Sequence, residues 1–263
     1  MTRRHEQVAH SRKLGEIRNI MNSMKTLAIM ETHKLERLLA TQLNMSETIE
    51  KMAADFLCFH PQVLPRVEPL LTTILLIGSE RGFCGNFNDR LAREIGLTLA
   101  QVIQNDTRLI AVGSKLHPLL NTLKKNIDFV KGANVADDIF RVAGELSGRL
   151  ADYPQPTALY VLHHKNQKND LALIKLLPPF KQPTDAIIKC SNPPLLNLSE
   201  RGFFLELTEH YLLHALHQAL YVSLLIENQQ RIQHLEGATH HLDDKTDQLK
   251  RKINALRQEE IIE

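Results

Sequence analysis

Residues 232–256, IQHLEGATHHLDDKTDQLKRKINAL, carry apolar or threonine side chains at alternating steps of three and four residues. The repeat consists of Ile232, Leu235, Thr239, Leu242, Thr246, Leu249, Ile253 and Leu256. A seam that returns every ~3.5 residues keeps one face of a helix against a partner helix. This stretch therefore predicts one half of a coiled coil.

The N-terminal end of the chain carries a matching apolar seam. Its members are Ile17, Met21, Met24, Ala28, Leu35, Leu38, Met45, Ile49, Met52 and Phe56. Proline breaks helix interiors, and every proline of this chain falls between Pro61 and Pro194. Each end is therefore predicted as one long helix, the first over residues 1–60 and the second over residues 203–263.

Helices of this length must project from a compact domain, because about 55 residues at ~1.5 Å each reach roughly 80 Å. A polar helix with only a narrow apolar stripe is marginal by itself in water. The two ends are matched in length and belong to one chain, so we expect them to pack as an antiparallel pair. A homodimeric coiled coil is the competing solution, and the heptads alone leave it open.

The middle of the chain, residues 70–195, alternates strand-like and helix-like patterns. The predicted strands cover 71–78, 109–113, 158–163 and 171–177, and the predicted helices cover 89–104 and 134–150, with a loop over 178–200. Strands separated by helices of this length indicate βαβ units and a mainly parallel sheet. The predicted fold class is α/β, with a long antiparallel coiled coil of N- and C-terminal helices plus a central Rossmann-like α/β domain.

Charge and hydropathy exclude several classes of protein. A net charge of +2 gives no basic field that would attract nucleic acid. The longest apolar runs, 74–77 and 220–226, are too short to span a bilayer. The first residues, MTRRHE, are not followed by the apolar segment of a secretory signal, so none is expected.

Three histidines, His210, His214 and His217, fall on one helical face, where they would suit a metal ion. However, Tyr211 stands where the helix of a zinc protease carries its glutamate. We expect these histidines to lie on a solvated or packing face, and no metal site is predicted.

A glycine-bearing loop, SERGFCGN at residues 79–86, follows the first predicted strand. Such a loop invites a nucleotide-binding interpretation, but it contains neither G-x-G-x-x-G nor G-K-[ST]. We therefore expect a tight turn into the next helix. No catalytic and no cofactor-binding residues are predicted. Two alternatives stay open: an enzyme whose α/β domain binds a nucleotide or cofactor between helical dimerisation arms, and a coiled-coil adaptor.

The same loop resembles the gamma subunits of F-type ATP synthases. Their Ser-Asp-Arg-Gly-Leu-Cys-Gly-Gly-Leu-Asn run is similar to SERGFCGNFN at residues 79–88. Further matches follow in order along the chain: VGSK at 112–115, LLP at 176–178, then Glu227, Arg231, Leu235 and Ala238-Thr239, and last Asn254, Arg257 and Gln258. The matches span nearly the whole chain.

The chain also departs from the family pattern. His240 and His241 stand where the family has Asp-Asn, and residues 257–263, RQEEIIE, are similar to the alternate gamma subunits of sodium-linked ATPases. The sequence ends soon after Gln258, where typical members continue further, so a shorter tip is expected.

The resemblance implies a non-catalytic rotor subunit of the central stalk, which couples transmembrane ion flow to ATP synthesis or hydrolysis. The implied partners are the alpha and beta subunits of the ring, the epsilon subunit and the c-ring of the membrane sector. The implied location is peripheral, at the cytoplasmic face of a bacterial inner membrane. Five positions match family contacts with the ring: Met24, Lys25, Arg231, Arg257 and Gln258. Met24 also lies on the predicted seam, so a coiled-coil core position is its alternative role.

Overall fold

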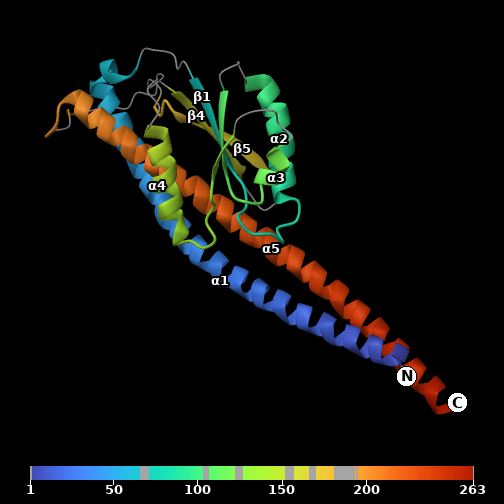
Figure 1. Cartoon of the computed structure of the whole chain (residues 1–263). Helices are drawn as coiled ribbons and strands as arrows, with labels where there is room; N and C mark the ends of the chain where they lie inside the picture. The colour runs from blue at the N-terminus through green and yellow to red at the C-terminus, as the bar shows by residue number, and fades with distance from the viewer. Residues whose placement is uncertain are drawn as a thin grey trace.

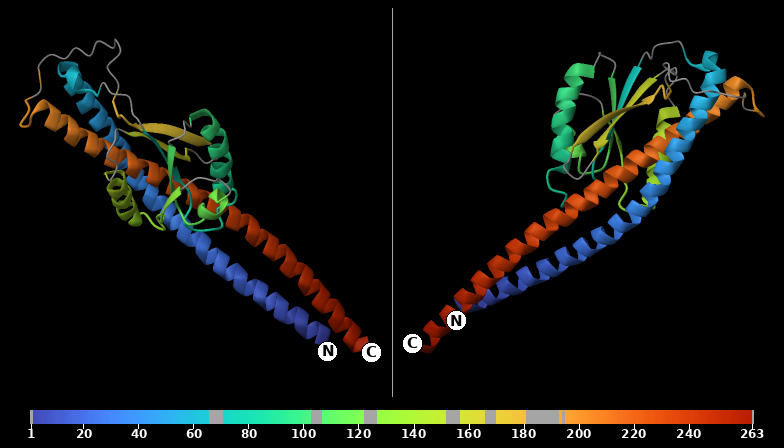
Figure 2. Two further views of the ribbon diagram at one scale, coloured as in Figure 1. Left: turned by 45° about the horizontal axis from the view of Figure 1, so that its top comes forward. Right: turned by 180° about the vertical axis from the view of Figure 1, so that it is seen from behind.

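The computed structural model describes residues 2–65, 71–102, 107–121, 127–151, 157–165, 170–180, 193 and 195–262. Two long helices, α1 (Thr2–Phe59) and α5 (Glu200–Ile262), lie side by side and carry a sheet that has helices on both of its faces (Figure 1). The two ends of the chain lie together at the far tip of the pair (Figure 2). The predicted fold class, an antiparallel helix pair with a central α/β domain, is confirmed.

The sheet has five strands in the order β3-β2-β1-β4-β5. Their bounds are β1 Leu71–Ile77, β2 Thr107–Val112, β3 Ile127–Val130, β4 Thr157–His164 and β5 Leu171–Leu177. The first four strands run parallel, and β5 pairs antiparallel with β4. The order 3-2-1-4 of the parallel strands is that of the first four strands of a Rossmann fold.

The helices of the central part are α2 (Phe87–Val102), α3 (His117–Leu120) and α4 (Asp138–Ala151), with a 3-10 turn, η1 (Pro61–Val63), after α1. Sequence analysis missed β3 and α3. β3 is only four residues long and only its last residue, Val130, is buried, so it lacks an apolar run. The part of the predicted loop at 181–192 lies outside the described residues.

Both faces of the sheet are buried, which is why β1 is almost continuously apolar. Ile74 and Leu76 point into a core shared with α2 and α3. Leu75 and Ile77 point to the other face, into a core that includes residues of α1, α4 and α5. The alternation of side chains along β1 thus fastens the sheet to the helix pair.

The predicted seam on α5 is confirmed, since all eight of its residues are buried or half-buried. The predicted seam on α1 is wrong in part, because Ile17, Met45 and Met52 are exposed. The observed seam contains Leu14, Met21, Ala28, Thr32, Leu35, Leu39, Ile49, Ala53 and Phe56. Some positions of the observed seam hold small or polar residues, such as Thr32 and Ala53. A pattern of large apolar residues does not include them, so the prediction placed Met52 in the seam instead of the adjacent Ala53.

No helix within the described residues has an 18-residue stretch apolar enough to cross a membrane.

Candidate functional site

Ion pairs between α1 and α5 show the direction and register in which the two helices pack. They join side chains on α1 to side chains on α5: Arg4 to Glu260 at 2.6 Å, Arg18 to Asp243 at 2.5 Å and Lys25 to Glu236 at 3.8 Å. As the residue number rises on α1 it falls on α5, so the helices are antiparallel. Each exposed pair is worth only about 0–1 kcal/mol, and most of the binding between the helices comes from the seam.

Arg231 is the central residue of a polar cluster buried between α5 and the loop that follows β1. The residue is 4% exposed. Nη2 donates to Glu227 Oε1, Nη1 donates to Asn228 Oδ1 at 2.7 Å, and Nε donates to the carbonyl oxygen of Gly82 at 3.1 Å. The guanidinium therefore ties α5 to the loop, and we call Glu227, Asn228, Arg231 and Gly82 the clamp.

The clamp depends on a buried carboxylate. Burial raises the pKa of Glu227, and the adjacent Arg231 guanidinium opposes that rise. A carboxylate that is 3% exposed would be costly without its partner. Each member of the pair is thus needed by the other.

The loop at residues 79–86 is tied to the first turn of α2 by hydrogen bonds. The backbone N–H of Ser79 donates to Asn88 Oδ1 at 2.9 Å, and Asn88 Nδ2 donates to Ser79 Oγ at 2.8 Å. Phe83 and Gly85 adopt positive φ values of 62° and 59°, which fold the chain tightly back into α2. The predicted tight turn is what the structure contains.

Glu80 occupies the place where a dinucleotide fold would bind phosphate, beyond the carboxyl ends of β1, β2 and β3. Its carboxylate accepts from the Ser114 N–H at 2.9 Å, from Ser114 Oγ at 2.7 Å and from the Gly132 N–H at 2.8 Å. Burial disfavours the charge, but the hydrogen bonds from Ser114 and Gly132 lower the pKa of Glu80 below its ordinary value. The N–H groups of Ser114 and Gly132 at this edge of the sheet thus bond to a carboxylate of the chain itself.

Both the backbone conformation of Gly113 and its close contact with Ser79 require a glycine at this position. Its φ is 103°, and a Cβ at this position would come within 2.6 Å of the Ser79 carbonyl oxygen. The close approach brings the end of β2 against the loop after β1 and sets Ser114 beside Glu80. Sequence analysis did not single out Glu80. The available signal was an acidic residue after one strand and a Gly-Ser pair after the next.

The five residues predicted to contact partners fall in two places. Met24 and Arg231 line one cavity of about 260 Å³ between α1 and the loop after β1, and Lys25 pairs with Glu236 beside it. Arg257 and Gln258 are exposed on the last turns of α5. Arg257 lies 26 residues beyond Arg231 on α5, which is roughly 40 Å of helix.

The guanidinium of Arg231 faces inward to the clamp, and its contact with a partner stays a prediction. Sequence analysis missed two exposed apolar neighbours of Met24 on α1. Leu27 is 57% and Met30 is 63% exposed, and both line the same cavity. They are apolar yet lie off the seam, which is the signal that could have identified them.

The three histidines on α5 do not converge. His214 Nδ1 lies 3.1 Å from Gln42 Oε1 on α1, while His217 packs edge-on against Phe140 of α4. The ring centroids of His214 and His217 are 6.5 Å apart. Within the described ranges, no three potential metal ligands gather into a site.

Comparison with known proteins matches residues 9–263 to a family model described as ATP synthase. The chain belongs to the ATP synthase gamma family. An ATP synthase gamma chain of Fusobacterium nucleatum is 21% identical and is aligned over 93% of this chain and 89% of its own length. An ATP synthase gamma chain of Clostridium perfringens is 24% identical and is aligned over 94% of this chain and 90% of its own length.

The fold agrees with this family membership. A chain in a central stalk and c-ring structure of the Tetrahymena thermophila mitochondrial ATP synthase is similar, with a TM-score of 0.57 and 19% identity. The similarity covers 83% of this chain and 99% of that one. Gamma-family membership makes the chain a central-stalk subunit of an ATP synthase.

Proposed function

We propose that the chain is the non-catalytic shaft of its ATP synthase, and that α1 and α5 stand in the axis of a ring of alpha and beta subunits. The observation that carries this proposal is the antiparallel helix pair, which extends past the sheet to a tip where both ends of the chain lie (Figure 2). The proposal also includes a location at the cytoplasmic face of a bacterial inner membrane, held there by partners.

The surface of the pair suits a rotating contact. A shaft must pass from one partner to the next without a deep energy minimum, and exposed ion pairs of about 0–1 kcal/mol each meet that need. The faces of the shaft also differ, because α1 carries the exposed apolar residues Leu27 and Met30. Each beta subunit would meet a different face, so that shaft angle and nucleotide affinity bias one another.

Within this proposal, Met24 and Lys25 contact the ring at the middle of the pair, and Arg257 and Gln258 contact it at the tip. Arg231 acts differently: it positions the loop at residues 79–86 against α5 and so transmits torque from the shaft to the sheet. The sheet would in turn hold the epsilon subunit and the c-ring.

Co-expression with the alpha and beta subunits of the same source, followed by native mass measurement, tests this function. The proposal expects a complex of three alpha, three beta and one copy of this chain. A chain that never joins the ring and purifies alone as a dimer would contradict it.

A further inference from the structure

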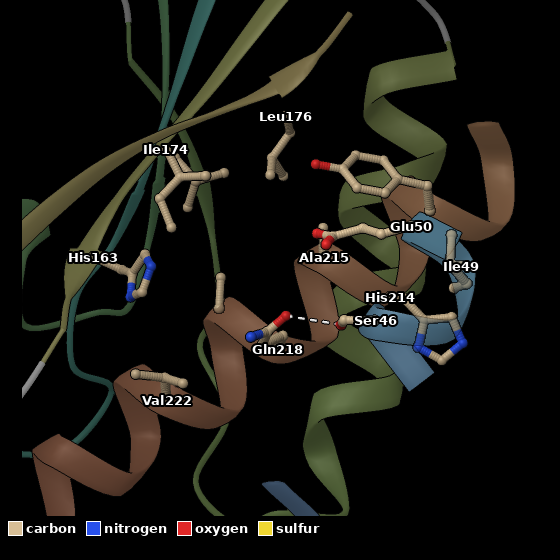
Figure 3. Close-up of a pocket in the computed structure, with 13 residues that line it drawn as sticks. Ser46, Ile49, Glu50, His163, Ile174, Leu176, His214, Ala215, Gln218 and Val222 are labelled. Carbon is tan, nitrogen blue, oxygen red and sulfur yellow. Dashed lines mark hydrogen bonds between the residues drawn. The ribbon is translucent and has the colours of Figure 1, made fainter. Parts of the chain in front are cut away.

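A cavity of about 240 Å³ lies where the helix pair passes β4 and β5 (Figure 3). Much of its wall is apolar and buried. This part of the wall includes Ile49 of α1, Val161 of β4, Leu176 of β5 and Ala219 of α5. An apolar cavity of about 150 Å³ is sufficient to hold benzene. The volume therefore suits the ring of a small aromatic compound.

Glu50 of α1 gives this wall a negative charge. Figure 3 shows its side chain extended toward the cavity that it lines. The described residues of the wall include no lysine and no arginine, and Lys51, the next residue of α1, pairs with Glu47 at 3.9 Å. Burial lowers the pKa of both histidines of the wall, His163 and His214, so neither carries a charge at neutral pH. The carboxylate of Glu50 is therefore not balanced by any cation among these residues of the wall.

Tyr211 of α5 lines the same cavity and lies near this carboxylate. Burial, followed by the charge on Glu50, raises the pKa of the Tyr211 hydroxyl, so this group is uncharged at neutral pH. A phenol oxygen can accept a hydrogen bond, and an aromatic ring attracts a cation over its face. An ammonium group would therefore meet two complementary partners here, a carboxylate and a phenol.

The other polar groups of the wall bond mainly within the chain. Ser46 Oγ of α1 donates to Gln218 Oε1 of α5 at 3.0 Å. His214 Nδ1 of α5 lies 3.1 Å from Gln42 Oε1 of α1. His163 Nδ1 lies 2.8 Å from a neighbouring backbone carbonyl oxygen and its Nε2 is buried, so this residue offers an occupant no polar atom. The two contacts between the long helices hold the wall in place before anything binds.

We propose that this cavity binds a small aromatic amine with one positive charge, whose ammonium group pairs with Glu50 and whose ring lies against Leu176. The apolar wall complements the ring and the carboxylate complements the charge. The walls come from both long helices and from two strands, so an occupant would contact the shaft and the sheet together. Since it would bind the folded chain alone, it would raise the melting temperature.

Fluorine NMR titration of the full chain tests the site with 4-fluorobenzylamine, protonated at neutral pH, and 4-fluorobenzyl alcohol, which has the same ring and no charge. Wild-type protein is expected to bind the amine about 5-fold more tightly, the upper end for an exposed ion pair. Glu50→Gln should equalise the two affinities. Glu47→Gln changes the net charge equally, at an exposed glutamate outside the cavity, and should keep the preference. Ala215→Leu should narrow the cavity and weaken binding of both probes.

Equal affinity of the two probes for wild-type protein would overturn the proposal, as would the absence of saturable binding. A preference for the amine that survives in Glu50→Gln would do the same, because the charge contact would then lie elsewhere. Unchanged binding of both probes to a folded Ala215→Leu chain would place them outside the cavity and refute the site. If Ala215→Leu does not fold, the contrast between Glu50→Gln and Glu47→Gln still decides, since both change exposed side chains.

Discussion

Replacing Arg231 by methionine is the perturbation that tests the clamp most directly. Methionine preserves much of the apolar stem but removes the guanidinium, which leaves Glu227 at 3% exposure without its partner. It also removes the donors to Asn228 and to the Gly82 carbonyl. Breaking a buried pair in this way costs about 3–5 kcal/mol. We expect a loss of about 3 kcal/mol, because burial raises the pKa of Glu227 and eases its neutralisation.

A double-mutant cycle measures this cost, with the free energy of unfolding of each variant determined in urea. Arg231→Met and Glu227→Leu should each destabilise the chain, and the double variant should lose less than the sum of the two by about 2 kcal/mol. The loss in Arg231→Met should shrink as the pH falls from neutrality, because a carboxyl with a raised pKa binds its proton more readily in the folded state. Lys250→Met, which breaks the exposed pair with Asp247, is the control and should cost under about 0.5 kcal/mol. Additive single losses would refute the clamp.

Three further predictions concern the seam, the loop and a buried histidine. Leu249→Asp should weaken the pairing of α1 with α5 by about 2 kcal/mol and so uncouple ATP hydrolysis from ion transport in the assembled complex. Gln248→Asp, on the exposed side of the same helix, should leave coupling intact. Tight coupling of hydrolysis to transport in the Leu249→Asp complex would contradict this prediction. Glu80→Ala should destabilise the chain by about 2 kcal/mol in urea unfolding, because the N–H groups of Ser114 and Gly132 lose their acceptor; an unchanged midpoint would argue against this. Burial lowers the pKa of His164 from 6.5 to about 4, so between these pH values the unfolded chain binds a proton that the folded chain does not. As the pH is lowered through this window, the free energy of unfolding should therefore decrease by up to about 3 kcal/mol. Unfolding at several pH values should show a smaller decrease in His164→Gln, and equal decreases would contradict the assignment.

The helix pair and the sheet were predictable because their signals are periodic and repeat many times. The seam from Ile232 to Leu256 specifies α5, and its whole apolar series packs inward. The run at residues 74–77 identifies a strand buried on both faces. β3 has no such repetition and owes its place to pairing with β2. Pairing with a neighbouring strand, and not the local sequence pattern, thus makes this segment a strand.

The polar residues of the site were harder to predict, because their roles depend on partners far away in the sequence. Arg231 was chosen from its position in a motif, but its contact with the Gly82 carbonyl spans 149 residues and can only be seen in the fold. Glu80 likewise bonds Gly132 across 52 residues. A motif identifies that a residue matters, whereas burial and hydrogen-bond partners decide whether it faces a partner protein or the chain itself.

The rotation of this chain within its ring is the central claim, and single-molecule observation tests it most directly. The alpha and beta ring would be fixed to a surface, and a bead would be attached through a cysteine introduced at Asp128, an exposed residue of β3 on the edge of the sheet. Addition of ATP should turn the bead in one direction and in steps. A complex that hydrolyses ATP at its normal rate while the bead stays still would contradict the account.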